Sequence, residues 1–128
     1  MYLVDSSVLI DHLRGGRDPV AEFRLFFEEG RLCTCGIVVC EVLRGIVKRP
    51  VFDRMEAFFS LVESVPLDGS LVRETSELAW RLDRQGVVLP LADLFIAAAA
   101  MRRNAVVVTT DPHFAAVPGL SVRASLAP

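Results

Sequence analysis

The chain has 128 residues, of which 52% are hydrophobic and 23% charged, and its formal net charge is −2 at pH 7. This length suits a single domain spanning residues 1–128, and the apolar composition without low-complexity tracts excludes intrinsic disorder. The slight negative charge argues against a domain that holds nucleic acid by bulk electrostatics.

The first half of the chain alternates short apolar runs with helical patterns. The predicted elements are a strand over residues 2–4, a helix that starts at Asp5 and ends at Gly15, a helix capped by Asp18 and stopped by Gly30, a strand over 32–35 and a helix over 36–48. Pro19 follows the cap Asp18 at the first helical position, where proline is favoured. The β-branched residues among 37–39 leave a strand as the alternative there.

The second half continues the alternation. The predicted elements are a helix over 51–63 separated by Pro50, an edge strand over 65–67, a helix over 71–85 capped by Ser70 and closed by Gly86, an apolar helix over 91–103, a strand over 105–110, a turn over 113–117 and a last edge strand over 120–124. Such alternation predicts an α/β fold, a three-layer α/β/α sandwich with a mostly parallel central sheet. Sites in these sheets lie outside the carboxyl ends of the strands.

Three cysteines, Cys33, Cys35 and Cys40, lie within one apolar stretch. Cys33 and Cys35 could supply half of a metal site, but no second cluster completes it in the sequence. The favoured interpretation is that all three are buried small hydrophobic residues in a reducing compartment.

We expect neither a membrane span nor a secretory signal in this chain. Asp93 and Arg102 bracket the longest apolar stretch, which is shorter than the ~18 residues of a membrane span. The first seven residues lack the basic region and cleavage site of a secretory signal. We therefore expect a cytoplasmic protein without membrane association. The glycine-rich motifs of dinucleotide and nucleoside triphosphate sites are absent from the sequence, which argues against a nucleotide cofactor.

Four acidic residues stand at the edges of the most apolar segments. Asp5 follows the first strand and Asp111 follows the run AVVVTT, while Glu41 interrupts an apolar helical face. Asp93 opens the apolar helix. Acids in such places lose hydration and repel one another unless a cation lies among them. Since Asp5 and Asp111 both follow strands, we expect the four to reach one cleft.

Each acid taken alone also has a simpler explanation. Asp5 would be an ordinary helix N-cap, and Asp111 would cap a turn. Asp93 would complement the dipole at the start of its helix, and Glu41 would pair with Arg44. These explanations do not account for four such acids at the ends of separate apolar elements in so short a chain.

Four segments, in this order, resemble the PIN-domain ribonucleases, and most of all the VapC toxins of prokaryotic toxin–antitoxin pairs. They are VDSSVLID at the N-terminus, EVLRG from Glu41, LADLFIAAA around Asp93 and VVTTDPHF around Asp111. The resemblance covers nearly the whole chain. It implies a PIN-like sandwich and a metal-dependent endoribonuclease.

The resemblance also implies roles for individual residues. The implied catalytic carboxylates are Asp5, Glu41, Asp93 and Asp111. The three aspartates would bind the metal ion, and Glu41 would bind it or orient a water. Ser7 and Thr109 match hydroxyl residues that orient waters or carboxylates around the metal.

The last segment departs from the pattern of many relatives. They carry T-x-N-x-x-D-F, whereas this chain has T-T-D-P-H-F, so that His113 replaces their last acid. The role of Asp111 is therefore less directly implied than those of Asp5 and Asp93.

The expected ion is Mg²⁺, with Mn²⁺ as the alternative, because both accept oxygen ligands and keep several waters. Such an ion would neutralise charge on a phosphodiester and activate a water for in-line attack. RNA rather than DNA is implied by the resemblance alone.

The resemblance implies two partners, a VapB-like antitoxin and a second copy of the chain in a homodimer. The aromatic-rich segments 23–27 and 52–59 either fill the core or form a groove for a partner helix. Three alternatives stay open: a catalytically inactive protein-interaction module on the same fold, a PIN nuclease that is not a toxin, and a structure-specific DNA nuclease. The last would carry longer insertions than this sequence has.

Overall fold

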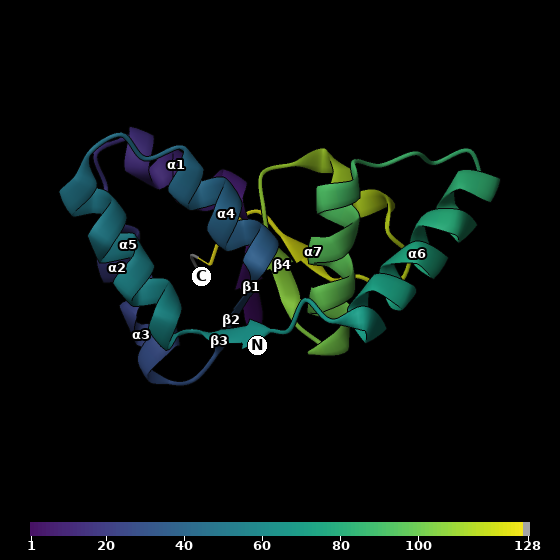
Figure 1. The fold of residues 1–128 in the computed structure, drawn as a ribbon, viewed down its shortest axis with the longest axis horizontal. Helices are drawn as coiled ribbons and strands as arrows, with labels where there is room; N and C mark the ends of the chain where they lie inside the picture. Colours follow the sequence, from purple (N-terminus) through teal and green to yellow (C-terminus); the bar gives the residue numbers. More distant parts are fainter. Residues whose placement is uncertain (127–128) are drawn as a thin grey trace.

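The computed structural model describes residues 1–126, and a five-stranded sheet lies at its centre (Figure 1). The strands are β1 (Tyr2–Val4), β2 (Leu32–Cys35), β3 (Glu63–Val65), β4 (Val106–Val108) and β5 (Val122–Arg123). Their order is β3-β2-β1-β4-β5, and each neighbouring pair is parallel. The carboxyl ends of β1 and β4, the two strands that precede Asp5 and Asp111, are therefore adjacent.

Helices flank this sheet. They are α1 (Ser6–Arg14), α2 (Pro19–Glu22), α3 (Arg24–Glu28), α4 (Gly36–Arg44), α5 (Arg49–Leu61), α6 (Gly69–Arg84), α7 (Leu91–Arg102) and the short 3₁₀ helix η1 (Pro112–Ala116). In Figure 1, α2, α3 and α5 gather to one side of the sheet and α6 and α7 to the other. The predicted α/β/α sandwich with a mostly parallel sheet is confirmed.

The central strands are buried because helices cover the sheet. Leu3 of β1 and Val107 and Val108 of β4 are fully buried, and Ile96 of α7 and Phe114 of η1 join them in one continuous core. Most of the aromatic residues in segments 23–27 and 52–59 serve this core rather than a groove. Phe23, Phe58 and Phe59 are buried, and the rings of Phe27 and Phe58 lie 5.7 Å apart.

Two predicted helices differ in extent from the observed ones. The helix that Asp18 caps is divided at Phe23 into α2 and α3, because the chain turns there and buries the Phe23 ring. The helix from Gly36 ends at Arg44 rather than at residue 48, with Gly45 as its C-cap. The strand alternative for residues 37–39 is wrong, since they are helical.

Two predicted helix starts also need correction. Asp68, not Ser70, caps α6, because its carboxylate accepts a hydrogen bond of 2.9 Å from the Leu71 backbone N–H. Pro50 lies within the first turn of α5 rather than before it. Proline is tolerated there because its missing N–H would have no partner in that turn.

The cysteines divide into two kinds. Cys33 and Cys35 are buried in β2, and burial raises the pKa of the Cys33 thiol to about 11. Both therefore act as small hydrophobic residues, as predicted. Cys40 is exposed on α4, so the prediction that all three are buried is wrong for this residue.

Among residues 1–126, no helix combines the length and the apolar character that crossing a bilayer requires.

Candidate metal centre

Asp5 lies where β1 passes into α1, and its residue is only 3% exposed. It occupies the N-cap position of α1, but its side chain accepts no capping hydrogen bond from that helix. Its Oδ2 instead accepts hydrogen bonds from Ser7 Oγ at 2.9 Å and from Thr109 Oγ1 at 2.8 Å. The simple N-cap explanation therefore does not account for this buried carboxylate.

Ser7 and Thr109 are fixed in turn by the backbone that follows β4. The N–H of Thr110 donates to Ser7 Oγ at 3.3 Å, and the N–H of Asp111 donates to Thr109 Oγ1 at 2.9 Å. Both hydroxyl groups are then oriented so that their protons point to Asp5 Oδ2. No hydrogen bond within residues 1–126 reaches the other oxygen of Asp5, Oδ1. That oxygen keeps its lone pairs for a ligand.

Glu41 projects from the middle of α4. Its Oε1 accepts a hydrogen bond of 3.1 Å from Ser6 Oγ. Burial raises the pKa of Glu41, and the negative charges of Asp5 and Asp93 raise it further. The positive charge of Arg44 lowers the pKa of Glu41, but this effect is smaller than those of burial, Ser6, Asp5 and Asp93. The proposed Glu41–Arg44 pair is therefore not what holds this acid in place.

Asp93 lies in the first turn of α7, where a carboxylate also complements the helix dipole. Burial raises the pKa of Asp93 above its ordinary value of 3.8, and the charges of Asp111 and Asp5 act in the same direction. A hydrogen bond from His113 opposes this shift. Like Glu41, Asp93 titrates as one member of a group of acids that repel one another.

Asp111 follows β4 and caps η1, since its Oδ1 accepts the His113 N–H at 2.9 Å. This cap brings the His113 ring back over the acids. Its Nδ1 lies 3.0 Å from Asp93 Oδ2 and 3.1 Å from Asp111 Oδ1. The ligand atoms of the three residues all lie within 4.8 Å of one another.

The structure thus brings the predicted acids and hydroxyls to one place at the carboxyl ends of β1 and β4. His113 was not among the predicted site residues. The signal that would have found it is the spacing Asp-Pro-His, because an Asp cap on a short proline-led turn returns the side chain two residues later.

This donor set fits a divalent cation. It offers several carboxylate oxygens, of which Asp5 Oδ1 accepts no hydrogen bond from residues 1–126, and the neighbouring acids help to raise the pKa values of Glu41 and Asp93. A cation among them would reverse that repulsion.

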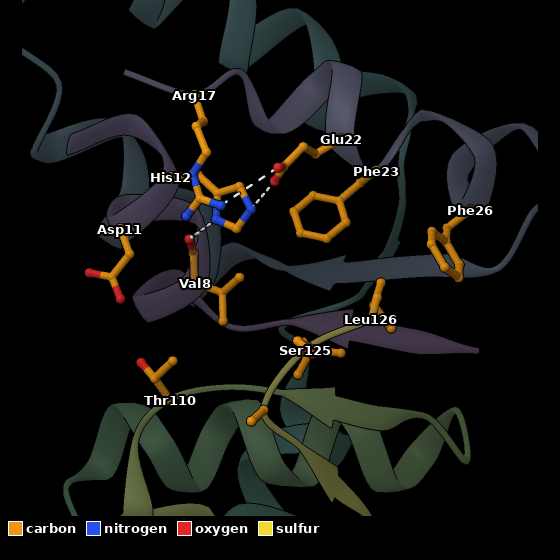
Figure 2. A pocket seen from close by; sticks show the side chains of 12 residues that line it. Val8, Asp11, His12, Arg17, Glu22, Phe23, Phe26, Thr110, Ser125 and Leu126 are labelled. Atoms are coloured by element: carbon orange, nitrogen blue, oxygen red, sulfur yellow. Dashed lines mark hydrogen bonds and ion pairs between the residues drawn. The ribbon is translucent and has the colours of Figure 1, made fainter. Parts of the chain in front are cut away.

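A cavity of about 460 Å³ lies beside this centre, between α1, α2 and the C-terminal segment (Figure 2). Val108 and Thr110, on either side of Thr109, line it together with Val8, the neighbour of Ser7. The opposite wall carries apolar rings such as Phe23. Figure 2 shows the His12 ring held between the carboxylate of Glu22 and the carbonyl of Val8.

Known proteins with similar sequences include two named as VapC nucleases. The chain is 25% identical over 124 residues to the tRNA(fMet)-specific endonuclease VapC of Shigella flexneri, covering 93% of each. It is 30% identical over 102 residues to ribonuclease VapC1 of Methanocaldococcus jannaschii, covering 80% of this chain and 69% of that one.

Among solved structures, a chain of the DNA-bound VapBC complex from Salmonella typhimurium superposes with a TM-score of 0.76 at 26% identity, over 95% of this chain and 96% of that chain. The family described as "PIN domain" matches residues 2–120, nearly the whole length. On this evidence the chain belongs to the PIN domain family.

Proposed function

We propose that this protein is a metal-dependent endoribonuclease, the toxin of a toxin–antitoxin pair, and that residues 1–128 form one PIN-like nuclease domain. The observation that carries the proposal is the convergence of Asp5, Glu41, Asp93 and Asp111 at the ends of adjacent parallel strands. Relatives named as VapC ribonucleases, which this chain matches along most of its length, support the same function.

Each residue of the centre has a proposed role that follows from its position. Asp5, Asp93 and Asp111 would hold Mg²⁺, or Mn²⁺ in its place, and Ser7 and Thr109 would keep Asp5 oriented. The bound ion supplies positive charge that stabilises the phosphate during cleavage. Glu41, whose pKa is raised mainly by burial, would accept a proton from the attacking water.

The cavity beside the centre gives room for RNA. Because Thr110 lines the cavity and its backbone N–H donates to Ser7 Oγ, which in turn donates to Asp5, a nucleotide in the cavity would adjoin the phosphate held at the acids. Its apolar rings suit a base, and the carboxylate of Asp11 could accept hydrogen bonds from base amino groups. We expect the protein to act on RNA in the cytoplasm.

The decisive test is cleavage of single-stranded RNA by the purified protein with Mg²⁺, with Mn²⁺ and with a chelator. Asp5→Asn and Asp93→Asn should lower the rate by about 100-fold or more, since each removes charge from the ion-binding centre. Asp83→Asn, a change of the same kind at an exposed position of α6, is the matched control and should cleave normally. Cleavage that survives both chelation and the site variants would overturn the mechanism.

The same purified protein also tests two alternatives, a DNA nuclease and a catalytically inactive interaction module. A DNA strand of the same sequence, cut as fast as the RNA, would point to a DNA nuclease. A catalytically inactive interaction module predicts that the wild-type protein neither cleaves RNA nor binds Mn²⁺. The presence of all four acids in one place argues against that alternative.

A VapB-like antitoxin is the proposed partner, and a homodimer the proposed assembly. The structure offers a groove of about 520 Å³ between α1, α4 and the start of α5. Its apolar lining is formed by Ile10, Leu13, Val42, Ile46, Val47 and Val51. Arg14 and Lys48 add positive charge around it, while Arg54 is paired with Asp18, so an apolar helix with acidic flanks would suit it.

A further inference from the structure

The imidazole of His113 lies among the acids, although a metal site built of oxygen ligands alone would not require it. Nδ1 of His113 is 3.0 Å from Asp93 Oδ2 and 3.1 Å from Asp111 Oδ1. The ring is brought there by its own turn, because Asp111 Oδ1 also accepts the His113 backbone N–H. The side chain is 48% exposed, so core packing does not force it into this position.

These separations are those of ligands around one ion. Two ligands at right angles, each about 2.1 Å from an octahedral ion, lie about 3.0 Å from each other. The nitrogen of His113 stands at that distance from both carboxylate oxygens. The three ligand atoms all lie within 4.8 Å of one another, so an ion beside them would replace the hydrogen bond between the His113 ring and the Asp93 carboxylate.

The other histidine of the chain provides a contrast. His12 has both ring nitrogens engaged, Nδ1 with the carbonyl of Val8 and Nε2 with Glu22. It lines the neighbouring cavity and faces none of the four acids. Of the two histidines, only His113 can offer a nitrogen to the centre.

We propose that His113 Nδ1 is a direct ligand of the metal ion, together with Asp93 and Asp111, and that it makes the site favour Mn²⁺ over Mg²⁺. The inference rests on the metal centre of the proposed function. Its physical basis is that Mg²⁺ is a small, hard ion that keeps to oxygen ligands in near-ideal octahedral geometry, whereas Mn²⁺ is a softer ion that accepts an imidazole nitrogen more readily than Mg²⁺ does. The site therefore differs from one built of carboxylates alone in its choice of ion.

The test is electron spin-echo spectroscopy of Mn²⁺ bound to the purified full-length protein. The wild-type complex should show the hyperfine coupling of a directly bound nitrogen. His113→Ala should still bind Mn²⁺ through the acids but lose this coupling. His12→Ala, the matched control, should keep it, and Asp93→Asn should weaken Mn²⁺ binding and so place the ion at this centre.

Calorimetry gives an independent measure. The ratio of Mn²⁺ affinity to Mg²⁺ affinity should fall in His113→Ala, because the variant loses the nitrogen ligand that Mn²⁺ accepts more readily than Mg²⁺ does. An equal fall for both ions would overturn the proposal.

The outcomes separate this proposal from the proposed function. Mn²⁺ that binds in an Asp93-dependent way without nitrogen coupling would overturn the role of His113 and leave the nuclease intact. A wild-type protein that binds no Mn²⁺ would overturn both.

Discussion

Asp5 shows how hydroxyl groups prepare a buried carboxylate for a ligand. Both Ser7 and Thr109 donate to the same oxygen, Oδ2, and no hydrogen bond of residues 1–126 reaches Oδ1. A carboxylate held this way presents its second oxygen in a fixed direction. The orientation of Asp5 then depends on a threonine 104 positions away in the chain.

Thr109→Val should weaken Mn²⁺ binding by about 10- to 100-fold, because loss of a group that orients a metal ligand costs that much. The fold should survive, since valine has nearly the same shape. Calorimetric titration of the purified variant measures the effect.

Thr75→Val is the matched control for that change. Thr75 is also buried, and its hydroxyl has no hydrogen-bond partner within residues 1–126. Valine there removes a desolvated polar group, so stability should be kept or increased while Mn²⁺ affinity stays unchanged. Equal losses of affinity in both variants would show that burial of a hydroxyl, not its bond to Asp5, is what matters.

Asp93 gives a prediction about pH. Burial raises its pKa in the folded protein, so the folded state binds a proton more tightly than the unfolded chain does. The free energy of unfolding of the metal-free protein should therefore fall as the pH rises above the ordinary value of 3.8 and through the raised pKa.

Asp93→Asn should remove part of this fall and raise the melting temperature of the metal-free protein at neutral pH. Saturating Mn²⁺ should stabilise the wild type and have much less effect on the variant. Thermal unfolding followed by circular dichroism across pH gives the comparison, with Asp83→Asn as control. A variant with the wild-type pH profile would contradict the assignment of the shift to Asp93.

At the level of elements, α7 carries Asp93 to the centre. Its residues Ala97, Ala99 and Ala100 are fully buried. Small side chains let α7 approach its neighbours closely, among them α6, α4, β2 and β4. Since Asp93 stands at its first turn, the fit of this helix sets the position of a site residue.

Ala97→Leu should destabilise the protein by about 1–3 kcal/mol, as larger side chains do in a filled core. Ala57→Leu, at an exposed position of α5, is the matched control and should change stability little. Urea unfolding measures both. A weakened Mn²⁺ affinity in Ala97→Leu would show that the packing of α7 also positions Asp93. An unchanged free energy of unfolding would mean that α7 has room to move.

At the level of the whole molecule, the metal centre and the groove between α1, α4 and α5 are separate surfaces joined by two helices. Ser6 and Ser7 begin α1, and Glu41 lies on α4, while Ile10 and Val42 of the same helices line the groove. An antitoxin bound in the groove would therefore lie near the acids. An arginine from it could enter among them and oppose their charge.

Val47→Asp should prevent copurification with a coexpressed VapB-like antitoxin and leave RNA cleavage by the free protein unchanged. Val47 is 97% exposed, so the change adds a charge to the groove without disturbing the core. Val88→Asp, at a position 79% exposed and outside the groove lining, is the matched control. Loss of the antitoxin in both variants, or in neither, would place the interface elsewhere.

Local patterns predicted most of the elements. Alternation of apolar runs and helical spacing identified five strands and their order along the chain, because these signals lie within a few neighbouring residues. The errors fall at boundaries. Asp68 rather than Ser70 caps α6, because both residue types can cap a helix and the local sequence does not choose between them. The helix after Asp18 is interrupted at Phe23, where the ring is buried in the core.

Four short motifs in a fixed order were enough to predict the family, which the comparisons confirm, and to propose the set of acids. The three-dimensional arrangement was needed to show which oxygen of Asp5 accepts no hydrogen bond from residues 1–126, that Glu41 accepts a hydrogen bond from Ser6, and that the His113 ring reaches Asp93. Each of these depends on a distance between side chains remote in sequence. Such distances are set when the parallel strands align their carboxyl ends. A local pattern such as Asp-Pro-His can turn the His113 ring back toward Asp111, but it does not specify the distance to Asp93.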